Sequence, residues 1–393
     1  MATPLKRAPE RLVVLLGNKL IGLDSILPVV MELKAEAPAL DVTFLFLNRA
    51  AVSVVERNYA LRDAMAATGR TEILAEGGGN PIQKALAGLR LLRWMARMLV
   101  RCTLLLSYAD LGRFPFKPLA WSARRGGGSA CTYCKTSYPG NDALNYVQGL
   151  KTAGRDMRWH DSGDAFFIYH PTQMQDYAGY NGAPVLLVGT PRRLPAWRAF
   201  LDKLASAHGI HDERGRDLTS LPSPVFVVFY PGPVVIPHQT DNVRETFLRM
   251  LDILAEETPG ATIVIKPHPV CDLDLLGRDI ADRNALDIRI SHAHPQLLMR
   301  IATVAISTNA SNVIYDCYME GVPVIETSRY QPDVLARGES LYPNRGRIGC
   351  PDEVTLRAAV RRAVTSPASS PAPDLDALVW PKPATLASVV WGG

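Results

Sequence analysis

The feature that most constrains the fold is an alternation of two patterns between residues 261 and 326. Short apolar runs rich in β-branched residues, such as A-T-I-V-I, V-A-I-S and V-P-V-I-E, alternate with helical segments of about 10 residues. This alternation is typical of βαβ units, which place their strands in a parallel sheet. Ligands of such sheets bind beyond the carboxyl ends of the strands. The region therefore predicts a doubly wound α/β domain with a site at one sheet edge.

Polar residues follow three of the predicted strands at the points where these strands end. The clusters are Lys266, His268 and Pro269 after the first strand, Ser307, Thr308 and Ser311 after the third, and Glu326 at the end of the fourth. Because the carboxyl ends of parallel strands meet at one edge of a sheet, we expect the three clusters to share one site.

The clusters have the chemistry of a nucleotide-binding site. The small-residue loop 307–311 precedes a helix predicted to begin near Ser311, so free backbone N–H groups and hydroxyls would attract a phosphate. His268 and Lys266 would face the same phosphate or a departing oxygen. Glu326 would accept hydrogen bonds from a ribose diol. Two simpler interpretations stay open, with Ser311 as an ordinary helix N-cap and the His-Pro pair as a turn.

The sequence K-P-H-P, followed by S-T-N-A-S-N-V-I-Y-D-C-Y-M-E-G-V-P-V-I-E, resembles the donor half of bacterial GT-B-fold glycosyltransferases of surface and capsular polysaccharide synthesis. The resemblance is to the sialyltransferase, polysialyltransferase and Kdo-transferase groups, with the CDP-glycerol polyol-phosphate transferases related to them. It covers residues 225–326 best. In these families a His-Pro motif and a Ser/Thr-rich motif bind the nucleotide phosphate. The resemblance assigns this role to His268, Pro269, Ser307, Thr308 and Ser311.

The resemblance implies transfer of a sugar from a nucleotide-activated donor to a glycan or lipid-linked acceptor in cell-surface polysaccharide synthesis. A CMP-linked donor is favoured, with UDP or CDP as alternatives, and the chemistry is expected to be inverting and independent of metal. No cofactor is expected. Three other functions stay open: a CDP-glycerol-type polyol-phosphate transferase, a nucleotide-sugar 2-epimerase, and a non-catalytic scaffold of a polysaccharide assembly complex.

The chain is long enough for a second domain of the same kind. It has 393 residues, of which 47% are hydrophobic and 21% charged, which suffices for two substantial cores. We expect a Rossmann-like acceptor-side domain over residues 1–195, a linker over 196–223, a donor domain over 224–365 and a C-terminal strap over 366–393. Two such domains facing a central cleft make the GT-B fold. A net charge of +5 gives no support for nucleic-acid binding.

The N-terminal half also begins with a βαβ pattern. The predicted elements are a strand at 12–16, a helix at 25–35 and a strand at 41–47. The loop after the first strand carries Gly17, Asn18 and Gly22 but no G-x-G-x-x-G, so the fingerprint of a dinucleotide site is missing. Gly17 and Asn18 are candidate contacts of the acceptor or of a phosphate.

Two carboxylates are candidates for the general base that deprotonates the acceptor hydroxyl. Asp24 lies in the first predicted loop, where it would alternatively cap the helix beginning at Ser25. Glu76 follows a predicted strand at 71–74 and is the second candidate. Arg192, after another predicted strand, is a candidate contact of the acceptor or of the donor phosphate.

Residues 81–106 form a long predicted helix with arginines on one face. These are Arg90, Arg93, Arg97 and Arg101. A basic amphipathic helix can lie at the surface of an anionic membrane, which predicts peripheral contact through residues 90–101, while an ordinary solvated face is the alternative. The chain shows neither a signal peptide nor an apolar run of ~18 residues. We therefore expect a cytoplasmic protein, attached at most peripherally to the inner membrane.

No metal site is expected. Cys131 and Cys134 form a C-x-x-C without a second pair at zinc-finger spacing. In the other main glycosyltransferase fold a D-x-D at the end of a strand binds metal. Here Asp272–Asp274 leads into a helix and 374–376 lies in the tail, so both are interpreted as helix caps or surface acids.

In the expected mechanism the nucleotide leaves as an anion while the sugar acquires oxocarbenium character. His268, helped by Lys266 and the backbone of the 307–311 loop, would neutralise the departing charge. Asp24, before Glu76, would deprotonate the acceptor. Further candidate donor contacts, from a Gly- and Pro-rich loop, are His238 and Gln239.

Overall fold

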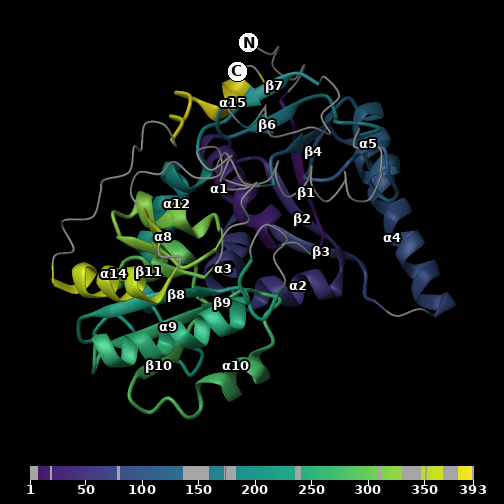
Figure 1. Cartoon of the computed structure of the whole chain (residues 1–393). Coiled ribbons are helices and arrows are strands. Elements are labelled where there is room, and N and C mark those ends of the chain that lie inside the picture. Colours follow the sequence, from purple (N-terminus) through teal and green to yellow (C-terminus); the bar gives the residue numbers. More distant parts are fainter. Residues whose placement is uncertain are drawn as a thin grey trace. The chain divides into compact units, whose positions relative to one another are not determined.

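The chain folds into two compact units (Figure 1). The computed structural model describes residues 8–17, 20–77, 80–135, 159–171, 173, 183–234, 240–308, 311–329, 347–349, 352–365 and 379–391. Unit 1 comprises Met1–Asp202 and Leu378–Gly393, and unit 2 comprises Lys203–Ala377. The first boundary between the units falls inside helix α8 (Pro195–His208).

Unit 1 is built on a seven-stranded parallel sheet of order β3-β2-β1-β4-β5-β6-β7. The strands are β1 (Arg11–Leu16), β2 (Asp41–Asn48), β3 (Arg70–Ala75), β4 (Thr103–Ser107), β5 (Ser129–Tyr133), β6 (Phe166–Ile168) and β7 (Val185–Leu187). The strand order reverses direction between β1 and β4, which makes their carboxyl ends the topological switch point of this unit.

Helices cover both faces of this sheet. They are α1 (Leu20–Glu36), α2 (Arg49–Glu56), α3 (Tyr59–Thr68), α4 (Pro81–Val100), α5 (Phe116–Arg125), the 3-10 helix η1 (Pro191–Arg193), α8 and α15 (Leu386–Trp391). On one face, Trp94 and Met98 of α4 pack with Leu119 and Ala123 of α5 against buried side chains of β1 and β4. The expected doubly wound N-terminal half is confirmed.

Unit 2 repeats the plan with a six-stranded parallel sheet of order β10-β9-β8-β11-β12-β13. Its strands are β8 (Val225–Tyr230), β9 (Thr262–Pro267), β10 (Asp287–Ile290), β11 (Val304–Ser307), β12 (Val324–Glu326) and β13 (Arg347–Gly349). Its helices are α9 (Val243–Glu257), α10 (Leu273–Ile280), α11 (Pro295–Leu298), α12 (Val313–Met319) and α14 (Glu353–Thr365). Here the order reverses between β8 and β11.

The core of unit 2 lies between α9 and the sheet. Phe247, Met250 and Leu254 of α9 are fully buried against apolar side chains of β8 and β9. The ring of Phe247 stacks on that of Tyr230, with centroids 4.0 Å apart. Apolar positions three to four residues apart therefore bury one face of α9, as a surface helix requires. At the carboxyl end of α9, Glu257 pairs with Arg357 of α14 at 3.0 Å.

Two helix boundaries predicted from the sequence are wrong. Helix α1 begins at Leu20 instead of Ser25, because buried side chains such as Leu23 and Ile26 outweigh the low helix propensity of Gly22 and Pro28. Helix α4 ends at Val100 instead of continuing to residue 106. The apolar residues that follow it form the buried strand β4, since periodicity alone does not separate a short buried strand from a buried helix.

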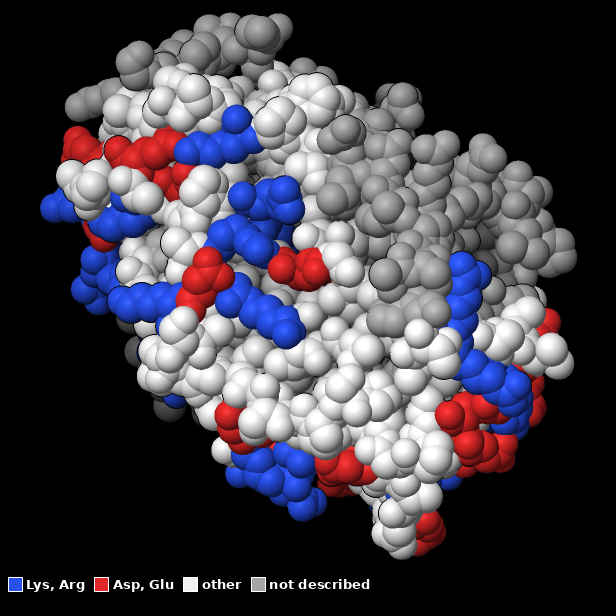
Figure 2. All heavy atoms as spheres, turned by 90° about the vertical axis from the view of Figure 1, so that its left-hand side faces the viewer, with Lys and Arg blue, Asp and Glu red and all other residues white. Residues whose placement is uncertain are grey.

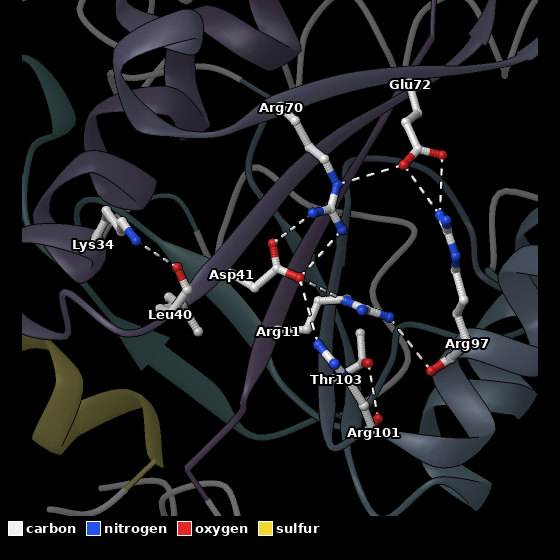
Figure 3. A network of polar contacts seen from close by, with 9 residues as sticks. All are labelled: Arg11, Lys34, Leu40, Asp41, Arg70, Glu72, Arg97, Arg101 and Thr103. Atoms are coloured by element: carbon white, nitrogen blue, oxygen red, sulfur yellow. Dashed lines mark hydrogen bonds and ion pairs between the residues drawn. The ribbon is translucent and has the colours of Figure 1, made fainter.

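An ion-pair network ties the amino ends of the unit 1 strands to α4 (Figure 3). Asp41 of β2 contacts Arg11 of β1 at 3.3 Å and Arg70 of β3 at 3.1 Å. Glu72 of β3 pairs with Arg97 of α4 at 3.1 Å. These groups lie at the edge opposite the carboxyl ends of the strands, so we interpret the network as structural. It also gives Arg97 an acidic partner on the sheet.

The C-terminal segment returns to unit 1. The carboxylate of Glu36 in α1 accepts hydrogen bonds from the backbone N–H groups of Leu386 (3.1 Å) and Ala387 (2.7 Å), which are the first residues of α15. Lys382 pairs with the same carboxylate at 2.8 Å and also with Glu32. The described part of the predicted C-terminal strap, residues 379–391, is thus held on α1.

Charge on one face of the molecule is mixed. Figure 2 shows Lys and Arg side chains interspersed with Asp and Glu and separated by uncharged surface. Among the described residues of this face, the basic side chains form no continuous track of the kind that follows a nucleic-acid backbone.

Candidate functional site

The carboxyl ends of β8 and β11 are locked together at the switch point of unit 2. Thr308, which follows β11, donates its backbone N–H (3.3 Å) and its hydroxyl (3.2 Å) to the carbonyl of Phe229 in β8. Ser307 and Thr308 are both fully buried. Two of the three predicted phosphate-binding hydroxyls are therefore buried below the protein surface. The hydroxyl of Thr308 links the ends of the two strands.

Ser311 is the partly exposed member of the same predicted cluster. Its Oγ accepts the backbone N–H of Val313 at 3.4 Å, and α12 begins at Val313. The predicted helix start near Ser311 is confirmed to within two residues. Asn312, at the N-cap position, makes no side-chain capping bond, so Ser311 supplies the hydroxyl at this helix end. Its role as a phosphate contact stays a prediction.

His268 lies directly beyond β9 in a tight turn. Its backbone N–H donates to the carbonyl of Tyr230 (2.9 Å), and its carbonyl accepts the N–H of Cys271 (2.8 Å). The N–H of Val270 donates to His268 Nδ1 at 3.3 Å. A ring nitrogen that accepts this bond carries no proton, so neutral His268 bears its proton on Nε2. The imidazole is therefore held as a hydrogen-bond donor through Nε2.

The protein keeps His268 in its neutral form. The residue remains in contact with solvent, yet neighbouring protein atoms desolvate the ring and lower its pKa below the usual 6.5, and the charge of Lys266 acts in the same direction. An uncharged donor suits a phosphate whose charge grows as the bond to its sugar breaks, because its interaction strengthens during the reaction.

The lowered pKa of His268 predicts a loss of stability in weak acid. The unfolded chain binds the imidazole proton near the usual pKa of 6.5 before the folded protein does, so the free energy of unfolding falls as the pH drops below that value. The loss levels off below the lowered pKa. Urea titrations at about pH 7.5 and about pH 5.5 measure the change. His268→Gln should show a smaller loss than the wild type, and an equal loss would contradict this account.

Lys266 and Glu326 flank the same edge. Lys266 is half-buried in β9 and its Nζ donates to the carbonyl of His292 at 3.4 Å, beyond the end of β10. Glu326 ends β12, lies beside Ser307 in the register of the sheet and is 1% exposed. Contacts of these side chains with a nucleotide stay predictions.

Some predicted contacts lie outside the described residues. These are Asn18, His238 and Gln239. The loop that leads from β8 to residues 235–239 contains Gly232, which lies in the left-handed region at φ +91°. A Cβ added there would lie 3.3 Å from Cys271, which follows His268 closely. The loop after β8 therefore approaches the His268 turn closely by its backbone.

In unit 1, a tyrosine missed by the sequence analysis lies close to Gly17 and Gly22. Tyr108 follows β4, and a Cβ added to Gly17 or to Gly22 would lie 2.7 Å from its side chain. The two glycines are therefore needed for close approach of this ring, whose desolvation raises the pKa of the phenol. The signal was hidden because the residues of β4 were assigned to a helix.

Asp24 lies in the second turn of α1 and not in the first loop, so its predicted position as a helix cap is wrong. Its carboxylate forms an ion pair with Arg192 of η1. The side chains are 15% and 5% exposed, respectively. Arg192 is buried against α1, and its contact with the acceptor or the donor phosphate stays a prediction. The role of Asp24 as general base stays a prediction.

Glu76 follows β3 directly and is shared by two arginines. Its carboxylate lies 3.0 Å from Arg90 of α4 and 3.7 Å from Arg49 of α2. The side chain is 46% exposed and lines a cavity of about 560 Å³. Both Asp24 and Glu76 thus have arginine partners.

The metal-ligating residue types do not gather in the described part of the chain, where no three or more His, Cys, Asp or Glu side chains form a group that could hold a metal ion. Cys131 and Cys134 are buried, and burial raises the pKa of the Cys131 thiol. Asp272 caps α10 by accepting the N–H groups of Asp274 and Leu275, both at 3.0 Å, which confirms its interpretation as a cap.

No protein-family model and no curated protein sequence matches the chain. Solved structures do match its fold. A UDP-GlcNAc 2-epimerase from Methanocaldococcus jannaschii has a TM-score of 0.54 at 13% identity, covering 92% of this chain and 95% of the other. TcCGT1 in complex with UDP has a TM-score of 0.53 at 11% identity, covering 92% and 91%. A UGT transferase from Siraitia grosvenorii in complex with UDP has a TM-score of 0.50 at 12% identity, covering 91% and 92%.

These likenesses extend over nearly the whole chain and confirm the expected fold, with two Rossmann-like doubly wound domains of the GT-B type. None of the described helices is both long enough and apolar enough to cross a membrane.

Proposed function

We propose that the protein is a glycosyltransferase that takes a sugar from a nucleotide-activated donor. The observation that carries the proposal is His268, held as a neutral Nε2–H donor at the carboxyl edge of the unit 2 sheet. This edge is where doubly wound sheets bind nucleotides. The likeness to structures solved with UDP supports a nucleotide diphosphate donor, and the sequence resemblance supports CMP.

In the proposed reaction the bond between the anomeric carbon and the phosphate oxygen breaks, and its electron pair stays on the departing nucleotide. His268 donates a hydrogen bond to the phosphate group as its negative charge grows, with Lys266 and Ser311 nearby. The acceptor oxygen forms a bond to the same carbon with inversion, without a metal ion. His238, Gln239 and Glu326 are proposed contacts of the rest of the donor.

The proton of the acceptor hydroxyl goes to a carboxylate of unit 1. We propose Asp24 for this role, before Glu76, because it lies in the second turn of α1, the helix that follows β1 at the switch point of this unit. Its carboxylate pairs with the guanidinium group of Arg192. Asp24→Asn should abolish transfer at neutral pH and leave nucleotide binding intact. If Glu76→Gln abolishes transfer instead, Glu76 is the base.

A nucleotide-sugar 2-epimerase is the second candidate, favoured by the fold of the Methanocaldococcus jannaschii enzyme. Incubation with CMP-, UDP- and CDP-linked donors, with and without a glycan or lipid-linked acceptor, separates the candidates. A transferase releases nucleotide only when it glycosylates the acceptor, whereas an epimerase acts without one. Release of CMP from CDP-glycerol would indicate a polyol-phosphate transferase. No turnover, and no thermal stabilisation by any nucleotide, would indicate a scaffold.

We also propose that α4 contacts an anionic membrane surface. The exposed apolar side chains of this helix are Ile82, Leu86, Leu89, Leu92, Leu99 and Val100. The helix has four basic residues and no acidic one. Such a helix lies with its apolar face among lipid headgroups. Co-sedimentation with anionic vesicles should fall for the variant Leu86→Ser with Leu89→Ser, and the wild type should bind uncharged vesicles more weakly. Equal sedimentation of both proteins would contradict the contact.

A further inference from the structure

A cavity at the open edge of the unit 1 sheet is not used by the proposed donor site. Its volume is about 560 Å³, within the usual range of small-molecule sites. It is bounded by the edge strand β3 and by residues of α2, α3 and α4. Arg49 follows the carboxyl end of β2 and Glu76 that of β3, so part of the cavity lies at the edge where ligands of doubly wound sheets bind.

The cavity has two chemically different parts. Buried apolar side chains, among them Val52, Val55, Met65 and Trp94, form part of its lining. Four arginines also line it, namely Arg49, Arg62, Arg90 and Arg93. A ligand that fits both parts carries an anionic group joined to an apolar group.

The carboxylate of Glu76 marks the place of the anionic group. It sits between Arg49 and Arg90, at 3.7 Å and 3.0 Å, and is 46% exposed. A second carboxylate of the lining, Glu72, is engaged with Arg97 in the network of Figure 3. Glu76 is exposed and its ion pairs are weak, so a phosphate can displace its carboxylate. The phosphate would then pair with the guanidinium groups of Arg49 and Arg90, each of which can donate two hydrogen bonds to phosphate oxygens.

We propose that this cavity binds the phosphate of an acceptor whose phosphate is joined to an apolar chain, with Glu76 occupying the phosphate position in the empty site. The inference rests on the proposed function, because it names the acceptor of that transfer. It is consistent with the position of α4, which contributes Arg90, Arg93 and Trp94 to the cavity and also carries exposed apolar side chains.

Binding of farnesyl monophosphate to the full chain, measured by calorimetry, tests the site. Arg49→Ala and Arg90→Ala should each weaken binding by about 10- to 100-fold, the effect of removing a charge-assisted hydrogen bond. Glu76→Gln should tighten it by about 2- to 5-fold, because a weak competing ion pair is removed. Arg57→Ala, at the exposed end of α2 and outside the lining, is the matched control and should bind like the wild type.

Three further ligands show which parts of farnesyl monophosphate the cavity recognises. Farnesol lacks the phosphate, inorganic phosphate lacks the apolar chain, and UMP carries its phosphate on a nucleoside, so all three should bind more weakly than farnesyl monophosphate. Equal binding of any of them would overturn the proposal, as would wild-type affinity in Arg49→Ala or no binding at all. Since Arg49 is 59% exposed, its replacement is not expected to unfold the chain.

The same binding experiment tests the proposed donor site and the proposed acceptor cavity independently. His268→Ala should bind farnesyl monophosphate like the wild type and lose affinity for UDP or CMP. If farnesyl monophosphate binds as predicted and no nucleotide does, the proposed transferase function falls while the cavity assignment stands. The reverse result removes the cavity assignment alone.

Discussion

His268→Ala is expected to lower the turnover number for sugar transfer by about 10²- to 10³-fold, the usual effect of removing one pre-positioned donor to a developing anion. The backbone of the turn fixes the tautomer of the ring. The N–H of Val270 donates to Nδ1, so the proton is carried by Nε2, which acts as the donor. Rates of nucleotide release at saturating donor and acceptor measure the effect. Turnover within about twofold of the wild type would remove His268 from the mechanism.

The control for His268→Ala is the same substitution at an exposed histidine outside the candidate site. His208 is exposed at the end of α8, so His208→Ala should leave turnover unchanged. The thermal midpoint of His268→Ala should remain close to that of the wild type, because substitutions of exposed side chains usually change stability by no more than about 0.5 kcal/mol. Unfolding of the His268→Ala variant would show that the side chain of His268 is needed for stability.

Arg192→Ala is expected to lower the free energy of unfolding by about 3–5 kcal/mol, the usual cost of breaking a buried ion pair from one side. Arg192 is 5% exposed and pairs with Asp24, which is 15% exposed, so the substitution leaves a carboxylate with little solvent. The ion pair also joins η1 to α1. Urea titration at neutral pH measures the change.

The adjacent arginine provides a matched control. Arg193 lies in the same short helix but is exposed, so Arg193→Ala should change the free energy of unfolding by no more than about 0.5 kcal/mol. The double variant Asp24→Leu with Arg192→Met should be more stable than Arg192→Ala, because both charges of the pair are replaced by apolar side chains. Equal stability of the Arg192→Ala and Arg193→Ala variants would show that the buried pair contributes nothing.

The fold could be predicted from the sequence because parallel strands that are buried on both faces consist of short apolar runs. Val225–Tyr230 and Val304–Ser307 are strands of this kind, and the loops at their ends carry the polar residues. The His-Pro turn could be found for the same reason, since Pro267 and Pro269 mark the end of β9. The start of α1 and the end of α4 could not, because tertiary packing overrides local propensity there.

The sequence by itself determined the doubly wound class, most strand positions and the place of the candidate donor site at the strand ends. Those features depend on residues close together in the chain. Only the tertiary structure decided that Asp24 meets Arg192, 168 positions away, that Thr308 is buried against Phe229, and that Arg49 and Arg90 share Glu76 beside a cavity. These pairings join helices and strands distant in sequence, and periodicity carries no information about which of them come into contact.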